Sequence, residues 1–201
     1  MIKVCMFDMG GVIVRDFQMA PELLPFLGRK ELAFADMPSA IKHALHDHSM
    51  GLIDEEKFWT IYERETSSIV ERNGQSLLGK FFHPVLDVPT MEVIKRLKRQ
   101  NMRIICGTNV IDSHFRIHHT LKQYDIFDRV YASHLMHLAK PDRAFYQYIL
   151  EKEKVSADEV FFTDDMEENI AVAKEEGLTA FHYTHAGNLI AQLKICGIDG
   201  I

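Results

Sequence analysis

Short apolar runs alternate with helical patterns from Asp87 to the end of the chain, and this alternation constrains the fold more than any other feature. A strand, a helix and a second strand in succession favour two parallel strands with the helix packed on one face of the sheet. We therefore expect an α/β fold with helices on both faces, and we expect the apolar run near the N-terminus to join the sheet. The expected strands are 2–7, 102–106, 130–132, 160–163 and 179–183, and the expected helices include 91–99 and 188–196.

Residues 16–83 break this rhythm, because they contain only helical patterns and turn signals. The turn signals are prolines and glycines, at Pro21, Pro25, Gly28, Pro38, Gly51, Gly74 and Gly79. The pattern indicates a helical cap inserted into the α/β unit. We expect a core of residues 1–15 and 84–201 and a cap of residues 16–83.

Composition excludes some classes of partner. The 201 residues, 47% of them hydrophobic, suffice for one buried core and a smaller unit. A formal net charge of -6 disfavours nucleic acid and acidic membrane surfaces. No apolar run has the length of a membrane span, and the apolar start is too short for a signal peptide. We expect a cytoplasmic protein with no nucleic-acid or membrane partner; its oligomeric state stays open.

Polar residues follow four of the expected strands directly or in the next loop. Open α/β sheets bind ligands beyond the carboxyl ends of their strands, so these side chains are expected to meet. Any one of the clusters has an ordinary explanation as a turn or a helix cap, but four in succession predict a site. The clusters are Asp8 with Gly10 and Gly11, Thr108 with Asn109, Lys140 with Pro141, and Asp164 with Asp165.

In this order the clusters resemble the motifs of the haloacid-dehalogenase superfamily. The strongest match is segment 162–177, which contains Asp164, Asp165, Asn169, Ala173 and Gly177. Segment 7–13 is similar to the first motif in a variant form, and the insert lies where that superfamily has its helical cap. The resemblance implies a doubly wound, Rossmann-like core and phosphatase activity. The pattern is most similar to bacterial sugar-phosphate phosphatases of the glucose-1-phosphate phosphatase type.

The expected chemistry begins with Asp8 as the nucleophile. A phosphate monoester brings about two negative charges to the site, so a carboxylate nucleophile needs a cation beside it. Hard oxygen ligands suit Mg²⁺. We expect Mg²⁺ to be held by Asp8, the backbone carbonyl of Gly10, Asp164 and Asp165, and an aspartyl phosphate to form on Asp8 before water hydrolyses it.

Three further residues are expected to bind the phosphate. Lys140 holds one oxygen and offsets the carboxylate charges as a point charge. The hydroxyl of Thr108 and the backbone N–H of Asn109 bind the remaining oxygens. The predicted function is hydrolysis of a small phosphorylated metabolite, with Asp8, Lys140 and Thr108 as catalytic residues and a sugar phosphate as the favoured substrate.

Gly10 departs from the pattern, because most phosphatases of the superfamily have an aspartate there that acts as general acid and base. General acid–base catalysis contributes about 10²- to 10⁴-fold in rate. A substrate with a good leaving group, such as an anomeric sugar hydroxyl, needs less of this help. The glucose-1-phosphate phosphatase type also has glycine at this position.

Two alternatives remain. One is a dehalogenase or phosphonatase branch of the superfamily; dehalogenases usually have tyrosine at the position of Gly10 and use no metal, whereas phosphonatases need a cap lysine. The insert offers Lys30, Lys42, Lys57 and Lys80. The other is a catalytically weak phosphate-binding or interaction protein, but such a protein is not expected to keep mutually repelling carboxylates.

Eleven histidines raise a metal hypothesis that the spacing does not support. His114 and His118 lie four residues apart, on one face of an expected helix, but no acidic or cysteine partner stands at ligand spacing. We expect a polar helix face there. In the cap, His43, His46, Asp47 and His48 form a polar group from which a substitute for the missing acid–base residue could come.

Overall fold

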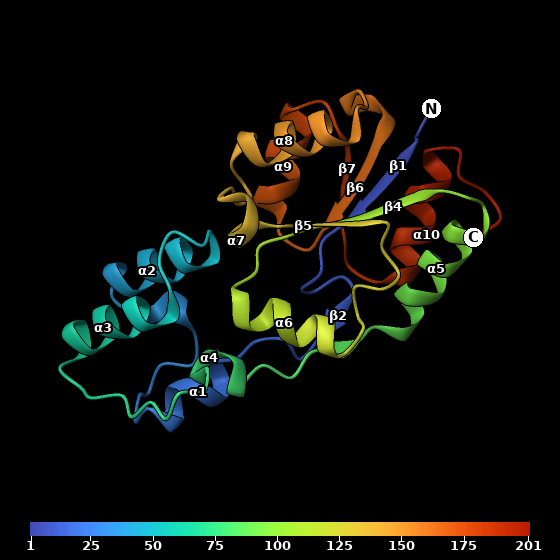
Figure 1. Cartoon of the computed structure of the whole chain (residues 1–201). Coiled ribbons are helices and arrows are strands. Elements are labelled where there is room, and N and C mark those ends of the chain that lie inside the picture. The colour runs from blue at the N-terminus through green and yellow to red at the C-terminus, as the bar shows by residue number, and fades with distance from the viewer.

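The structure, a computed structural model, describes residues 1–201. Five parallel strands form the main sheet in the order β5-β4-β1-β6-β7 (Figure 1). The expected α/β fold is confirmed, and each of the five expected strands is present. The strands are β1 (Val4–Phe7), β4 (Arg103–Thr108), β5 (Arg129–Ala132), β6 (Val160–Asp164) and β7 (Thr179–His182).

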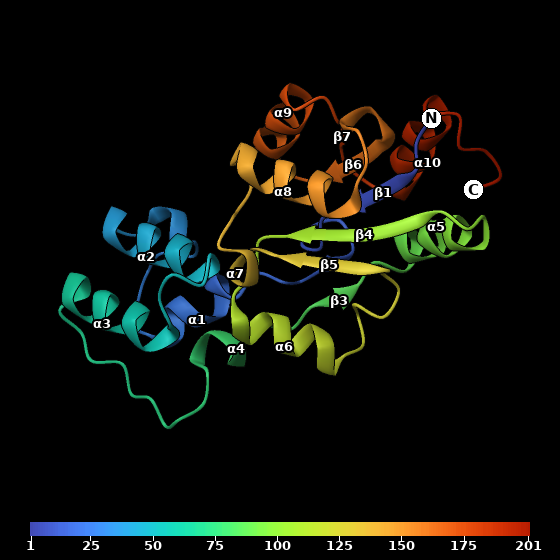
Figure 2. The ribbon, with the colours of Figure 1, turned by 45° about the horizontal axis from the view of Figure 1, so that its top comes forward.

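Both faces of the sheet are covered by helices, as Figures 1 and 2 show. Cys5 and Phe7 point into an apolar cluster with α5 and α10, and Val4 and Met6 point into another with α8 and α9. A strand buried on both faces must be apolar at every position, which is why β1 reads as a continuous apolar run. The covering helices are α5 (Val88–Arg99), α8 (Arg143–Glu153), α9 (Glu167–Glu175) and α10 (Ala186–Ile195).

Two strands extend further than the sequence indicates. Thr108 still pairs with Ala132 of β5, and Asp164 with His182 of β7. Both polar residues are therefore the last residues of their strands, held by the ladder. Lys140 lies beyond the short helix α7 (Ser133–Met136), which follows β5 directly and which the sequence does not predict. The 3₁₀ turn η2 (Ala157–Glu159) precedes β6, and α6 (Asp112–Thr120) follows β4.

The helices that are expected to form a cap lie between β2 and β3 in the chain and, in Figure 2, beyond the carboxyl ends of β4 and β5. They pack around their own apolar cluster, in which Phe58, Trp59 and Tyr62 are fully buried and Ile111 is a member from after β4. Asp54 caps α3 by accepting a hydrogen bond from Lys57 N at 2.8 Å. The cap helices are α1 (Ala20–Phe26), η1 (Phe34–Asp36), α2 (Ser39–Ser49), α3 (Glu55–Thr66) and α4 (Leu77–Lys80).

A two-stranded antiparallel ribbon, which the sequence does not predict, joins the two ends of this segment. It consists of β2 (Val14–Arg15) and β3 (Val85–Leu86). Strands of two residues carry no periodic signal, so only the folded chain reveals them. An ion pair from Arg15 Nε to Asp87 Oδ2 at 3.0 Å follows the ribbon, and Asp87 Oδ1 accepts the N–H of Thr90 at 2.9 Å to cap α5.

Replacing Asp87 with Ala is expected to lower the free energy of unfolding by about 1–2 kcal/mol, since a helix cap and a partly exposed ion pair are lost together. Asp87→Asn keeps an oxygen that can cap the helix, so it should cost about 1 kcal/mol or less. Urea denaturation of both variants measures the difference. Equal losses in the two variants would assign the effect to the ion pair instead of the cap.

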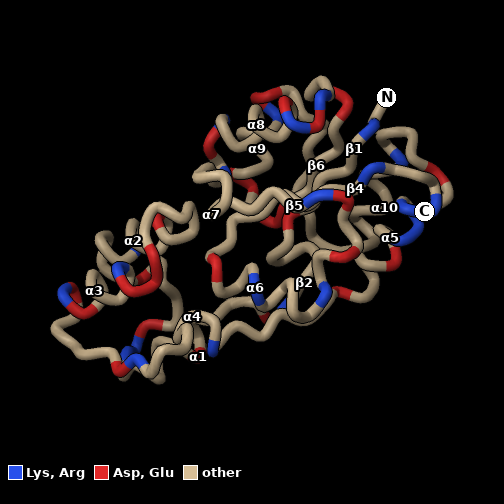
Figure 3. The backbone as a smooth tube through the Cα atoms, in the orientation of Figure 1, with Lys and Arg blue, Asp and Glu red and all other residues tan.

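Charged residues of both signs are spread over the core and the cap helices (Figure 3). None of the helices combines the length and the apolar character needed to cross a membrane.

Candidate active site

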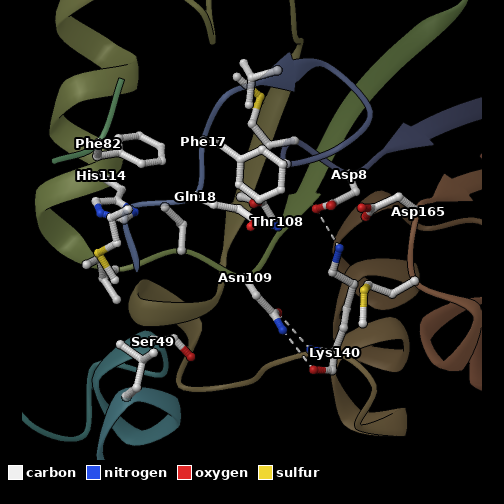
Figure 4. A pocket seen from close by; sticks show the side chains of 18 of the residues that line it. Asp8, Phe17, Gln18, Ser49, Phe82, Thr108, Asn109, His114, Lys140 and Asp165 are labelled. Carbon is white, nitrogen blue, oxygen red and sulfur yellow. Dashed lines mark hydrogen bonds and ion pairs between the residues drawn. The ribbon is translucent and has the colours of Figure 1, made fainter. Parts of the chain in front are cut away.

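The predicted clusters meet at the carboxyl edge of the sheet, around the ammonium of Lys140. Its Nζ donates a hydrogen bond to Asp8 Oδ1 at 2.7 Å (Figure 4) and another to Asp164 Oδ2 at 2.6 Å. All three side chains are buried, with Asp164 fully inaccessible. A buried charge is stable only when it is paired, so the lysine holds the two carboxylates in one arrangement.

The two adjacent aspartates of the site differ in how many hydrogen bonds their carboxylates accept. Asp164 Oδ1 accepts hydrogen bonds from Met166 N at 2.8 Å and Asn169 Nδ2 at 2.9 Å, in addition to the lysine on Oδ2. No other residue donates a hydrogen bond to the carboxylate of Asp165, which is only partly buried and lines the pocket. Asp165 is therefore the freer ligand of the two.

One oxygen from each of Asp8, Asp164 and Asp165 lies within 4.8 Å of the others, a spacing that a single cation can span. Burial raises the pKa of Asp8 to about 7; Lys140 opposes this rise and Asp164 adds to it. Burial and Asp164 also raise the pKa of Asp165. The pKa of Lys140 lies above its usual range, because the two carboxylates outweigh the effect of burial. Three buried or half-buried carboxylates against one ammonium fit a hard divalent cation.

Gly11 brings the loop after β1 against Asp165. Its φ is +72°, and a Cβ added there would lie 2.1 Å from Asp165 Oδ2. Only glycine fits both the conformation and the space. The carbonyl of Gly10, expected as a metal ligand, accepts none of the backbone hydrogen bonds of this turn, so it is free for such a contact.

Thr108 and Asn109 lie where the sequence places them, on the floor of the pocket (Figure 4). Thr108 is buried, and its hydroxyl has no hydrogen-bond partner within the protein. The amide of Asn109 does something the sequence does not reveal: Nδ2 donates to the carbonyl of Lys140 at 2.8 Å, and Oδ1 accepts the N–H of Lys140 at 2.9 Å. Asn109 therefore positions the backbone that carries the lysine.

Phe17 occupies the space beside Gly10 that a longer side chain would fill. A Cβ added at Gly10 would lie 3.0 Å from Phe17 Cε2. An aromatic ring therefore lies against the position at which the expected aspartate is absent. Phe17 has no motif signal, since it lies in the segment between the ribbon strand β2 and α1, outside the clusters that follow strands.

A pocket of about 540 Å³ opens above these residues. Its walls come from the core and from the cap helices, so both parts of the chain contribute to one cavity. The cap contributes residues from before α1, from η1 and from α2. His43, His46, Asp47 and His48 do not line it, so the polar group expected in the cap stays outside the pocket.

The expectation of a polar face on α6 is wrong. His114 and His118 line the pocket; His114 stacks on Phe82 with ring centroids 3.6 Å apart, and His118 is 2% exposed. Burial lowers the pKa of His114 to about 3 and also lowers that of His118, so both rings are neutral near pH 7. The spacing of four residues indicated one face correctly, but only the packing of α6 against Phe82 decided that this face points inward.

A parallel sheet, a helical segment beyond its carboxyl edge and a carboxylate–lysine cluster between them define a Rossmann-like α/β protein with a candidate active site at that edge. The family model described as a haloacid dehalogenase-like hydrolase matches residues 2–177. The chain belongs to this family.

Known relatives agree with this assignment. A sesquiterpene phosphatase of Aspergillus oryzae is 32% identical over 102 residues, which cover 49% of this chain and 50% of the relative. The chain thus aligns with about half the length of this relative. A HAD-like family hydrolase of Porphyromonas gingivalis has a TM-score of 0.78 at 19% identity, covering 99% of both chains. A HAD family enzyme of Bacteroides thetaiotaomicron, solved with magnesium and inorganic phosphate, has a TM-score of 0.72 at 20% identity, covering 92% of this chain and 96% of that one.

At such identities the two structures support the fold. The three relatives named do not bear on the glucose-1-phosphate phosphatase type, which stays a prediction.

Proposed function

We propose that this protein is a Mg²⁺-dependent phosphatase that hydrolyses a small phosphorylated metabolite through an aspartyl phosphate on Asp8. The observation that carries the proposal is the ammonium of Lys140 between Asp8 and Asp164, beside the free carboxylate of Asp165, at the floor of a pocket. The phosphatase relative of Aspergillus oryzae and the magnesium and phosphate bound by the Bacteroides enzyme support it.

The metal ligands in this proposal are Asp8, the Gly10 carbonyl and Asp165, with Asp164 fixed by its own hydrogen bonds at the edge of the site. The cation supplies positive charge that offsets the repulsion between the phosphate and the carboxylates. The fit rests on the donor set, because carboxylate and carbonyl oxygens are the ligands that Mg²⁺ prefers.

The proposed reaction uses these residues directly. The free oxygen of Asp8 attacks phosphorus, the phosphorus–oxygen ester bond breaks, and the leaving oxygen takes a proton from water. Lys140 neutralises one phosphate oxygen, and the unpartnered hydroxyl of Thr108 and the N–H of Asn109 bind the others. Water subsequently attacks the acyl phosphate, which restores Asp8 and releases inorganic phosphate.

We further propose that residues 16–83 act as a cap whose residues select the substrate. Its own apolar cluster and its share of the pocket wall support this division. The sequence favours a sugar phosphate for two reasons. One is the family resemblance. The other is that glycine at position 10 provides no general acid, so a substrate with a good leaving group is expected. The composition of the pocket wall favours a less polar organic group.

The four cap lysines bear on the phosphonatase alternative. Lys30, Lys42, Lys57 and Lys80 are all exposed, and none of them lines the pocket. A Schiff base requires a lysine that reaches the bound substrate. The phosphatase proposal is therefore preferred.

Replacing Asp8 with Asn is expected to lower turnover of any substrate by on the order of 10⁴-fold or more, since the amide cannot attack phosphorus. A chelator should abolish the turnover of the wild-type protein, and Mg²⁺ should restore it. Phosphate release from a panel of phosphorylated sugars, nucleotides and small acids measures both effects. Asp47→Asn, a cap substitution outside the pocket, is the control. Turnover that persists in Asp8→Asn or in chelator contradicts the mechanism.

A further inference from the structure

The pocket has two chemically different ends. The charged groups gather at one end, around Asp8 and Lys140, and in Figure 4 Phe82 and His114 lie at the other. Between and around them the wall is mostly apolar. Its large apolar residues are Phe17, Met19, Phe34, Leu45, Phe82 and Ile111.

The polar groups in this apolar part are mostly engaged already. Ser49 Oγ donates to the carbonyl of His46 at 2.7 Å within its own helix. His118 is hydrogen-bonded to Gln123, and His114 Nε2 lies 3.2 Å from the carbonyl of Leu78, to which it must donate. His114 is neutral, so its remaining nitrogen can only accept. Gln18 is the one side chain here with both a free donor and a free acceptor.

A sugar bound in this space would bury several hydroxyls with few partners. Each hydroxyl that loses water without gaining a hydrogen bond weakens binding by roughly tenfold. Apolar groups gain instead, by about fourfold for every methylene removed from water. The apolar wall also begins next to the reaction centre, because a Cβ added at Gly10 would lie only 3.0 Å from the ring of Phe17.

We infer that the substrate is a phosphate monoester whose organic part is predominantly apolar, an aryl or hydrocarbon group. Its phosphate lies on Asp8 and Lys140, and its organic part contacts Phe17, Leu45 and Phe82. The inference rests on the proposed phosphatase function. A phenol is in addition a better leaving group than an aliphatic alcohol, which suits a site that has no aspartate at Gly10.

The test is a series of straight-chain alkyl phosphates, methyl, butyl and hexyl, with glucose 1-phosphate beside them. The alcohols in the alkyl series have similar leaving-group pKa values, so the rate of the chemical step is nearly constant. Differences in kcat/KM then measure how the pocket binds the alkyl chain. We expect kcat/KM to rise at least about 100-fold from methyl to hexyl phosphate. Glucose 1-phosphate has a better leaving group, so it is compared by KM, which should be higher than that of hexyl phosphate. A flat alkyl series, or a tenfold lower KM for glucose 1-phosphate, overturns the inference.

Binding separates this inference from the phosphatase proposal. Calorimetry with the Asp8→Asn protein and Mg²⁺ measures the affinity for hexyl and methyl phosphate without turnover. Tighter binding of hexyl phosphate, combined with no hydrolysis by the wild-type protein, supports the apolar pocket and contradicts the phosphatase proposal. Equal binding of the two overturns the inference.

A pair of cap variants locates the effect. Leu45→Ser places a hydroxyl in the pocket wall, and Leu52→Ser makes the same change at a leucine that is 57% exposed and outside the pocket. The ratio of kcat/KM for hexyl over methyl phosphate should fall at least fivefold in Leu45→Ser and stay within twofold in Leu52→Ser. An unchanged ratio in a folded Leu45→Ser protein overturns the placement of the organic group.

Discussion

Replacing Lys140 with Met is expected to lower the free energy of unfolding by about 3–5 kcal/mol in metal-free buffer, because two buried carboxylates lose their only cationic partner. Methionine is similar in length to lysine, so the loss of stability measures the removed charge more than a change in volume. The same variant should lower kcat/KM at least about 10²-fold, since a charge that stabilises the phosphoryl group is gone. Urea denaturation and phosphate release measure the two effects.

The loss of stability should depend on pH. Asp8 has a pKa of about 7 in the folded protein against 3.8 for an ordinary aspartate, so between these values the folded state keeps a proton that the unfolded state has lost. The contribution of Asp8 to stability therefore falls as pH rises through this window. Lys140 lowers the pKa of Asp8, so its removal extends the window upward, and Lys140→Met should lose more stability at pH 8 than at pH 5.

Lys95→Met is the matched control for this variant. Lys95 pairs with Glu92 at 2.6 Å, the same distance as between Lys140 and Asp164, but the side chains of Lys95 and Glu92 are both about half exposed. Its loss should cost about 1 kcal/mol or less at either pH. If Lys140→Met were as stable as Lys95→Met, the buried ion pairs would not hold the site together.

Gly11→Ala is expected to weaken Mg²⁺ binding by about 10- to 100-fold, the range for changes that displace a metal-binding carboxylate from outside its ligand shell. The added Cβ would lie 2.1 Å from Asp165 Oδ2, so the carboxylate has to move. Activity should fall with the affinity and recover in part at high Mg²⁺. The dependence of phosphate release on Mg²⁺ concentration measures this.

Gly28→Ala separates the clash from the backbone strain. Gly28 has a φ of +73°, close to the +72° of Gly11, but no atom lies within 4 Å of an added Cβ. Both variants should lose about 1–2 kcal/mol of stability from the left-handed conformation, and only Gly11→Ala should change the Mg²⁺ dependence. The same Mg²⁺ dependence in both variants would remove Asp165 from the metal site.

The core could be predicted from the sequence because its strands are buried on both faces. Such strands need apolar residues at every position, as in segment 4–7, and helical periodicity marks the segments that cover them. The meeting of the four polar clusters could also be predicted, since the carboxyl ends of parallel strands share one edge. Lys140 shows the limit: its residue type and its loop are readable, but its two carboxylate partners lie 132 and 24 positions away in the chain.

Features that depend on packing between distant segments were beyond the sequence. The ribbon of β2 and β3 is too short to carry a period, and the inward face of α6 depends on the approach of Phe82. The hydrogen bonds that Asn109 makes to Lys140 join two loops that no local pattern connects.

By itself, the sequence predicted the candidate site residues, which belong to the four clusters that follow strands, because residue type and strand order are local properties of the chain. Only the tertiary structure decided how these residues are used. Asp164 accepts local hydrogen bonds from Met166 and Asn169 and a distant one from Lys140, whereas Asp165 stays free, and the ring of Phe17 lies beside Gly10. Which partner a side chain meets depends on the distance between segments after folding, and that distance is not encoded at any one position.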